Sequence, residues 1–175
     1  SASDAPFSEI LQKAIDSGYT EPDPREDLCG NDVGRKLLIL ARELDLENEF
    51  EEVAIENLIP EDLRQGSREE FLTRLKEFDP IYQQIKDKAP AGTVLRYVGD
   101  LHGDLSHTSI ARLEVKLVSV PITSALGQVK GADSIFEIYT ESYGENPIVI
   151  QGAGAGAAVT ARGVFGDILR IIGNK

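Results

Sequence analysis

Residues 18–36 hold the side chains that are best placed to act together in polar chemistry. The segment reads GYTEPDPREDLCGNDVGRK: a loop with four acidic side chains leads into a predicted helix, in which Asp32 and Lys36 are four residues apart. Positions four residues apart share one face of a helix. A carboxylate and an ammonium, which can donate a proton to a reacting group, therefore point the same way beside a loop rich in further carboxylates.

The loop of this segment is predicted to be stiff and without regular structure. Pro22 and Pro24 remove two backbone donors and favour extended conformations at Glu21 and Asp23. A stiff loop over residues 20–29 can hold its carboxylates at fixed positions, as a binding site requires. The alternative is a solvated acidic loop, which is common in a chain with a net charge of -12.

The helix that carries Asp32 and Lys36 is predicted over residues 31–44. Its apolar stripe consists of Val33, Leu37, Leu40, Ala41 and Leu44, with Leu38 and Ile39 beside it. Asp32 lies in the first turn, where the helix dipole favours an anion. An exposed pair at this spacing contributes only about 0.3–0.5 kcal/mol, so a plain surface ion pair is the alternative to a reactive site.

A preceding helix over residues 7–17 is predicted to end at Gly18. Its apolar side chains follow the spacing of one helix face and are Phe7, Ile10, Leu11, Ala14 and Ile15. Gly18 can serve as the C-cap of this helix, or it can let the backbone approach a ligand closely. The sequence leaves both interpretations open.

The remainder of the chain alternates irregularly between strands and helices. Strands are predicted over residues 52–59, 93–101, 108–120, 134–140 and 148–150, and helices over 67–78, 79–88 and 159–172. Ser67 and Glu70 have the spacing of a capping box, and residues 93–120 read as a hairpin. This order predicts an α+β fold with a mixed, largely antiparallel sheet covered by helices, a C-terminal helix after a Gly-rich loop, and one domain over residues 1–175.

The Gly-rich run GAGAGAA, residues 152–158, matches a dinucleotide-binding fingerprint in its letters but not in its context. Gly152, Gly154 and Ala157 fit G-x-G-x-x-A. That fingerprint opens a βαβ unit whose second strand follows about 20 residues on, and the sequence stops at Lys175. Two interpretations stay open: small residues that let the last helix pack closely on the sheet, or a loop that lines a ligand cleft.

Composition narrows the classes of partner and site. A net charge of -12 opposes binding to nucleic acid and to acidic membrane surfaces, and no apolar run reaches the about 20 residues that span a bilayer. Cys29 is the sole cysteine, which excludes an internal disulfide and suits a reducing compartment such as the cytoplasm. His102 and His107 are interpreted as surface histidines, so no metal site is expected. Ser1 in place of Met predicts a piece of a longer protein.

Two longer runs resemble one enzyme family. The run GYTEPDPREDLCGNDVGRKLLILAR resembles the substrate-domain signature of homoserine dehydrogenases, and YGENPIVIQGAGAGAAVTARGVFGDILR resembles the end of the same family. The resemblance extends over residues 7–172 and is weak between 50 and 142. It implies the reversible reduction of L-aspartate 4-semialdehyde to L-homoserine with NADPH or NADH, in the biosynthesis of threonine, methionine and isoleucine.

The resemblance also implies roles for single residues. Lys36 matches the catalytic lysine, which would donate a proton to the new alkoxide while Asp32 holds it in position. Carboxylates would bind the α-ammonium of the substrate, and glycines would lie beside the cofactor. The implied residues are Glu21, Asp27 and Asp32 for the substrate, and Gly18, Glu21 and Gly156 for NADP or NAD. Glu26 departs from the pattern, which usually has Asp there, and is given no role.

The resemblance further implies that half of the enzyme lies outside this chain. The nucleotide-binding domain of the family holds most of the cofactor site and a second active-site lysine, and no part of this sequence matches it. The chain alone is therefore expected to be the inactive substrate-binding and dimerisation half, in a homodimer. The rivals are a non-catalytic dimerising assembly module and a self-sufficient nucleotide-binding protein built on the run at Gly152.

Overall fold

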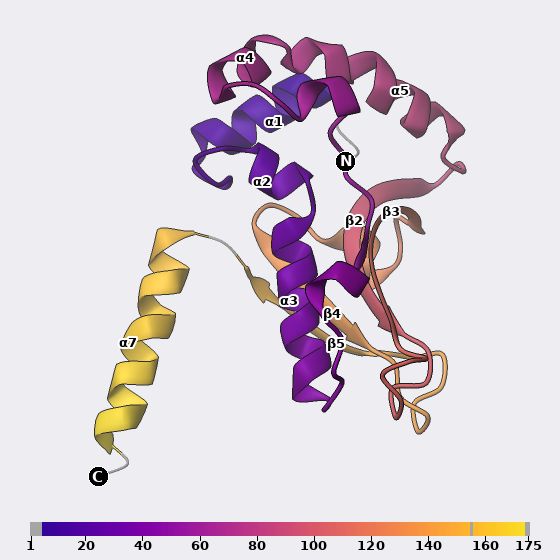
Figure 1. The fold of residues 1–175 in the computed structure, drawn as a ribbon, viewed down its shortest axis with the longest axis vertical. Coiled ribbons are helices and arrows are strands. Elements are labelled where there is room, and N and C mark those ends of the chain that lie inside the picture. Colours follow the sequence, from indigo (N-terminus) through magenta and orange to yellow (C-terminus); the bar gives the residue numbers. More distant parts are fainter. Residues whose placement is uncertain (1–4, 155, 174–175) are drawn as a thin grey trace. The chain divides into compact units, whose positions relative to one another are not determined.

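The computed structural model describes residues 5–154 and 156–173, and Figure 1 draws their helices and strands. These residues form two compact units that divide between Val120 and Pro121. The first unit contains α1 (Phe7–Asp16), α2 (Arg25–Leu28), α3 (Asn31–Glu43), β1 (Ala54–Ile55), α4 (Arg68–Thr73), α5 (Phe78–Lys88), β2 (Thr93–His102) and β3 (Arg112–Pro121). The second unit contains α6 (Ala125–Gln128), β4 (Asp133–Ile138), β5 (Ile148–Ala153) and α7 (Ala157–Gly173). The elements confirm the α+β class and the C-terminal helix.

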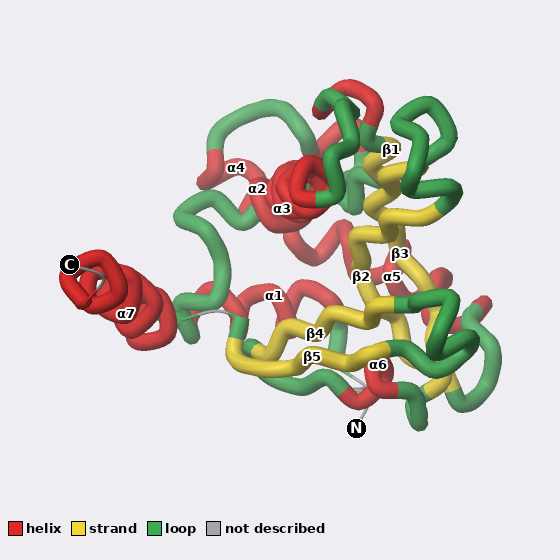
Figure 2. The backbone as a smooth tube through the Cα atoms, turned by 90° about the horizontal axis from the view of Figure 1, so that it is seen from below, coloured by secondary structure: helices red, strands yellow, loops and turns green. Residues whose placement is uncertain are grey.

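Three strands form the sheet of the first unit, in the order β1–β3–β2 (Figure 2). β1 runs parallel to β3, with Ala54 opposite Glu114. Residues 103–111 join β2 to β3. This connection is shorter than the dozen residues that a parallel crossover needs, so β2 and β3 form the expected antiparallel hairpin. The sheet is therefore mixed, as the sequence predicts.

Helix α3 covers one face of this sheet. A side chain at Gly99 of β2 would touch Val33 and Leu37, which shows that the helix lies directly on the strand. The core beneath it consists of Leu37, Ala41, Leu46, Val53, Ala111, Leu113 and Val115. Burial of each large side chain contributes about 1.5–3 kcal/mol. This packing fixes the axis of α3, and with it the positions of Asp32 and Lys36.

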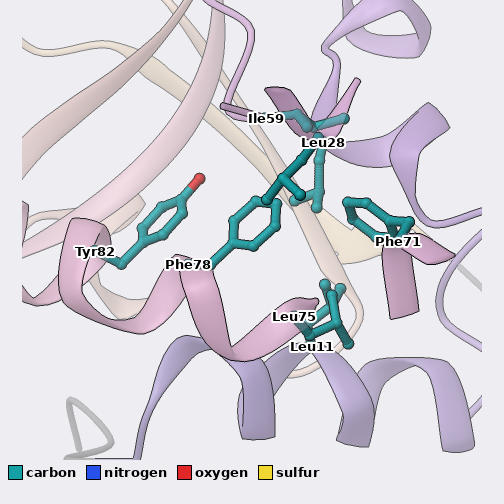
Figure 3. Close-up of a cluster of buried hydrophobic side chains, with 8 residues drawn as sticks. Leu11, Leu28, Ile59, Phe71, Leu75, Phe78 and Tyr82 are labelled. Carbon is teal, nitrogen blue, oxygen red and sulfur yellow. The ribbon is translucent and has the colours of Figure 1, made fainter. Parts of the chain in front are cut away.

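A second core joins α1, α2, α4 and α5 (Figure 3). Its members are Leu11, Leu28, Ile59, Leu63, Phe71, Leu75, Phe78 and Tyr82. Phe78 is fully buried, and the ring of Phe71 meets it edge-on with 5.6 Å between the ring centroids. Leu28 is the last residue of α2, and its carbonyl accepts a hydrogen bond from Leu58 N–H at 3.0 Å. The acidic segment is thus anchored to this core through α2.

The expectation that residues 20–29 lack regular structure is wrong, because α2 lies within them. Pro24 precedes the helix with φ of -64° and ψ of -8°, which are helical values. Proline stops a helix in its interior but suits the first turn, where the missing N–H would have no partner. Pro24 is therefore compatible with the helical turn that follows it and does not exclude one.

The helical region after Ser67 is more broken than predicted. The capping box is confirmed: Ser67 Oγ accepts from Glu70 N–H at 3.1 Å, and Glu70 Oε2 accepts from Ser67 N–H at 2.8 Å. The single helix predicted over residues 67–78 is instead α4 followed by a 3-10 turn at 75–77. Helix α5 then begins at Phe78, whose ring is buried in the aromatic core.

Two further predictions are wrong in extent: the length of one strand and the width of the buried face of α3. Of the strand predicted over residues 52–59, only residues 54–55 form β1, with one further bond to β3 from Glu56 N–H to Val115 O at 2.8 Å; residues 50–52 form a 3-10 turn. Leu40 and Leu44 were expected to face the core, and they are exposed. The buried row of α3 is narrower than the predicted stripe, since only one side of the helix touches the sheet.

In the second unit, β4 and β5 pair antiparallel from Asp133 opposite Ala153 to Ile138 opposite Ile148. β5 is longer than predicted, so Gly152 lies inside the strand opposite Ser134 and not in a loop. An antiparallel hairpin is not the βαβ unit that a dinucleotide fingerprint opens. The rejection of that fingerprint is therefore confirmed.

Helix α7 forms as predicted, and its apolar side chains are exposed. They include Val164, Phe165, Ile168, Leu169 and Ile172. The β4–β5 hairpin likewise exposes Phe136, Ile148, Val149 and Ile150. Within the described residues, no helix combines the length and the apolar character that crossing a membrane requires.

Candidate active site

The start of α3 is pressed against the sheet of the first unit. Gly30 precedes α3 with φ of +82°, and a Cβ there would collide with the Tyr97 hydroxyl and with Ile55 Cγ2. The Tyr97 hydroxyl donates to Glu56 O at 2.6 Å, and burial raises the pKa of Tyr97 to about 12. Tyr97 is therefore a neutral, fixed side chain, and only glycine fits between it and the helix.

The loop before α3 is held by two arginines. Arg25 binds the Asp23 carboxylate at 2.6 Å, donates to Gly66 O at 3.0 Å, and stacks over the ring of Phe71. Arg68 of α4 donates to Pro22 O at 2.7 Å. The hydrogen bonds from Arg25 lower the pKa of Asp23. The Asp23 carboxylate is therefore already paired, which agrees with its having no predicted site role.

Asp27 is the central carboxylate of the predicted site. Its Oδ2 accepts a hydrogen bond from Glu21 N–H at 3.0 Å. Burial raises the pKa of Asp27, the Glu21 N–H partly opposes this shift, and the carboxylates of Glu21 and Asp32 raise the pKa further. Three of the predicted residues thus lie close enough to interact, and their negative charges repel one another.

Asp32 and Lys36 form the ion pair expected from their spacing. Lys36 Nζ lies 2.7 Å from Asp32 Oδ2, and the two side chains are 70% and 46% exposed. With Glu21 and Asp27 they make up what we call the carboxylate–lysine set. It contains three carboxylates and one ammonium, so one cation leaves most of the negative charge of the set unpaired.

Gly18 has a local reason for its conformation. Its φ is +69°, its N–H donates to Ile15 O, and Tyr19 N–H donates to Ala14 O. These two bonds make a Schellman motif, so the C-cap interpretation is confirmed. A Cβ at Gly18 would have no neighbour within 4 Å. The space beside this glycine would admit a cofactor, and contact with one stays a prediction.

The glycines of the second unit behave differently from one another. Gly156 has φ of +117°, and a Cβ there would have no neighbour within 4 Å. At Gly154, by contrast, a Cβ would collide with Ser134 Oγ of β4. Close packing therefore explains Gly154, though against a strand and not against the last helix. The open surface at Gly156 is compatible with a ligand, as predicted there.

The residues that sequence reasoning missed come from distant parts of the chain. Arg68 and Tyr97 hold the loop and the start of α3, and their own neighbours in the sequence give no sign of it. Arg25 lies within the acidic segment, and its two-residue spacing from Asp23 was a usable signal. His102 lies on the surface, as predicted, and the structure also places it near Asp100 and Glu114, which its spacing in the sequence did not indicate.

A surface pocket of about 300 Å³ lies elsewhere, and none of the predicted residues lines it. Its walls are Asn48, Glu52, Ala54, Thr108, Ser109, Ala111, Arg112, Leu113 and Glu114. The carboxylate–lysine set instead faces open surface on the described part of the chain, as the exposure of Lys36 shows.

Comparison with known proteins gives one consistent family. The family model for homoserine dehydrogenase matches residues 1–169. A homoserine dehydrogenase of Paracoccidioides brasiliensis is 46% identical over 171 residues, which cover 95% of this chain and 44% of the relative. A chloroplastic bifunctional aspartokinase/homoserine dehydrogenase of Daucus carota is 44% identical, over 97% of this chain and 18% of the relative. This chain thus spans less than half the length of these relatives.

Solved structures agree with the sequence match. A Candida auris protein of unknown function superposes with a TM-score of 0.81 at 40% identity, over 97% of this chain and 46% of that one. A homoserine dehydrogenase of Thiobacillus denitrificans gives a TM-score of 0.63 at 25% identity, over 94% of this chain and 33% of that one. The similarity covers both compact units. The chain belongs to the homoserine dehydrogenase family.

Proposed function

We propose that this chain is the substrate-binding and catalytic half of a homoserine dehydrogenase, which interconverts L-aspartate 4-semialdehyde and L-homoserine with NADPH or NADH. The carboxylate–lysine set carries the proposal. It unites, within 16 residues of sequence, a partly desolvated carboxylate, two further carboxylates and a lysine held by one of them. The family membership supports the same assignment.

The carboxylates would bind the α-ammonium that both substrates carry. Asp27 uses Oδ2 to accept from Glu21 N–H, which leaves Oδ1 for the ammonium. The mutual repulsion among Glu21, Asp27 and Asp32 would be relieved by a bound cation, because it supplies the charge that the set lacks. The net negative charge of the set thus selects an amino-bearing substrate.

Lys36 would be the proton donor of the reduction and the proton acceptor of the reverse reaction. A bound NADPH or NADH would supply a hydride to the aldehyde carbon, and the oxygen would then take the electron pair of the C=O double bond. The Lys36 ammonium stabilises this oxyanion and gives it a proton, which yields the alcohol. In the reverse direction the neutral lysine takes the proton back. Asp32, 2.7 Å away, acts as a positioning residue for the ammonium.

Gly18, Glu21 and Gly156 are the residues of this chain that we assign to the NADP or NAD contact. The surface is open at both glycines. Most of the cofactor would be held by an upstream nucleotide-binding domain, since the matched relatives are more than twice as long as this chain. That domain would also cover Lys36, whose side chain is 70% exposed here.

The exposed apolar surfaces support the proposed partners. We assign the apolar face of α7, which includes Phe165 and Leu169, to the upstream domain, and the exposed face of β4 and β5 to a second copy in a homodimer. Side chains of this size are costly to leave in water. We place the protein in the cytoplasm, because the single thiol of Cys29 suits a reducing compartment.

The test is NADP-dependent oxidation of L-homoserine, followed by the absorbance of NADPH. The chain alone and the chain joined to its upstream domain are compared. Activity only in the joined protein is expected. Activity in the chain alone would contradict the division into two halves and favour the self-sufficient nucleotide-binding protein. Inactivity of both would favour the non-catalytic assembly module, which the exposed apolar surfaces also suit.

A further inference from the structure

A second group of charged side chains lies on the sheet of the first unit, apart from the carboxylate–lysine set. Gly99 and Leu101 of β2 face α3 and its core, so the alternation of a strand turns Asp100 and His102 to the opposite face. Leu113 and Val115 of β3 face the same core. Glu114 and Lys116 therefore share the outer face with Asp100 and His102.

Three of these side chains converge as metal ligands do. One ligand atom each of Asp100, His102 and Glu114 lies within 4.8 Å of the other two. His102 Nδ1 is 3.4 Å from Asp100 Oδ2. Ligands at zinc distances of about 2.1 Å and tetrahedral angles are about 3.4 Å apart. The histidine and one carboxylate are thus at the right separation, and Glu114 needs only a small shift of its side chain.

The backbone fixes this arrangement in advance. Asp100 and His102 are two residues apart on β2, and Glu114 lies on the neighbouring strand β3. Side chains on paired strands lose little freedom when they meet a common ligand, because the strands already hold their Cα positions. One imidazole and two carboxylates leave a fourth position open for water.

Lys116 now lies between the two carboxylates of the group. Its Nζ lies 2.5 Å from Glu114 and 2.9 Å from Asp100. One ammonium faces two carboxylates, so one negative charge is in excess. A lysine ammonium is strongly hydrated and sits on a flexible stem, and the Lys116 side chain is 35% exposed. It can therefore move into water when a stronger cation arrives.

We propose that Asp100, His102 and Glu114 form a binding site for a divalent transition-metal ion of the zinc type, which replaces the Lys116 ammonium between the two carboxylates. The histidine selects zinc-like ions over magnesium and calcium, which prefer oxygen ligands alone. Metal binding would tie β2 to β3 and raise the melting temperature of the chain.

The test is a calorimetric titration of the chelator-treated chain with Zn²⁺, with Co²⁺ absorption to report the ligand geometry. His102→Ala is expected to weaken Zn²⁺ binding at least about tenfold, because it removes the nitrogen ligand. Lys116→Met is expected to strengthen binding about tenfold, because it removes the competing cation. His107→Ala is the matched control: this exposed histidine lies in the connection that follows β2, outside the group. Its affinity is expected to equal that of the unchanged chain.

Several results would overturn the proposal. One is the absence of Zn²⁺ binding by the unchanged chain, even if Lys116→Met binds, because the metal would then be unable to displace the lysine. Another is equal affinity with and without His102, which would place the ion elsewhere, for example at the acidic loop. Equal losses in the His102→Ala and His107→Ala variants would also contradict it. Circular dichroism melts of each variant without metal confirm that the fold is retained.

Discussion

The acidic segment has two sides with opposite electrostatics. On one side Asp23 is paired with Arg25, and Arg68 holds the neighbouring backbone. On the other side the carboxylates of Glu21 and Asp32 repel that of Asp27, and of the three only Asp32 is seen to pair with Lys36. The first side is neutralised by its own chain and serves as an anchor. The second keeps a surplus of negative charge, which is the property of a surface that binds a cationic ligand.

The largest expected effect tests the open side. Lys36→Ala in the chain joined to its upstream domain should lower kcat for homoserine oxidation by about 10²–10⁴-fold, as removal of a general acid does. The melting temperature should stay within about 2 °C, because an exposed ion pair contributes little. Lys13→Ala on α1, another exposed lysine, is the control and should keep full activity. Normal turnover in Lys36→Ala would favour the alternative interpretation, in which Asp32 and Lys36 are only a surface ion pair.

The next effect concerns the junction that positions α3. Gly30→Ala should destabilise the first unit by about 2–4 kcal/mol, since it adds a collision with Tyr97 to the cost of a positive φ. Gly18→Ala should cost only about 1 kcal/mol, because its φ is similar but its Cβ would meet nothing. Urea unfolding of both variants separates the cost of the positive φ from the cost of the collision with Tyr97. Equal losses would show that Tyr97 yields to the new methyl group.

The anchored side should respond more weakly. Arg25→Ala removes the pair with Asp23, the hydrogen bond to Gly66 O and the contact over Phe71. We expect a loss of about 1–2 kcal/mol and a higher KM for homoserine, because the loop that carries Glu21 and Asp27 loosens. Arg170→Ala, which removes an exposed pair on α7, is the control for stability. A lower kcat with unchanged KM would contradict an anchoring role.

The smallest expected effect is a difference between Asp27 and Asp23 in how their contributions to stability change with pH. The pKa of Asp27 is raised, so its contribution to stability is present in acid and is lost as the pH rises through that pKa. The pKa of Asp23 is lowered, so its contribution is present near neutrality and is lost as the pH falls through that pKa. At neutral pH, Asp27→Asn should therefore raise the melting temperature slightly, by about 1–3 °C, and Asp23→Asn should lower it.

The difference for Asp27→Asn should vanish below the ordinary pKa of Asp, which is about 3.9. The difference for Asp23→Asn should vanish only at lower pH, below the lowered pKa of the Asp23 carboxyl. Thermal melts of the two variants and the unchanged chain across the acidic range measure this. Shifts of the same sign at neutral pH would mean that the two sides do not differ as described.

Local patterns predicted most of what depends on neighbours in the sequence. The spacing of Leu37 and Ala41 predicted α3 and its buried side, and the Ser67–Glu70 spacing predicted a capping box that the structure contains. Alternation predicted β3, with Leu113 and Val115 inside. These features depend on backbone periodicity and on hydrogen bonds within one turn, which a short stretch of sequence specifies.

Features that depend on distant contacts escaped prediction. The helical turn after Pro24 forms because Leu28 enters a core built by residues 59–82. The crowding of Gly30 depends on Tyr97, and the group around His102 depends on how β2 lies beside β3. The assignment of the site residues came from resemblance, because spacing alone was compatible with an ordinary ion pair.

The position of Leu28 bears on how the proposed site fluctuates. Its side chain is packed with Phe71 and Phe78, and its carbonyl accepts from Leu58 N–H. Opening α2 would therefore remove a leucine from the core, at a cost of about 1.5–3 kcal/mol. Amide protons around Cys29 should exchange with solvent more slowly than those of a surface turn that buries no side chain. The carboxylates before Lys36 would then hold their positions before a ligand binds, so binding would not require the loop to fold.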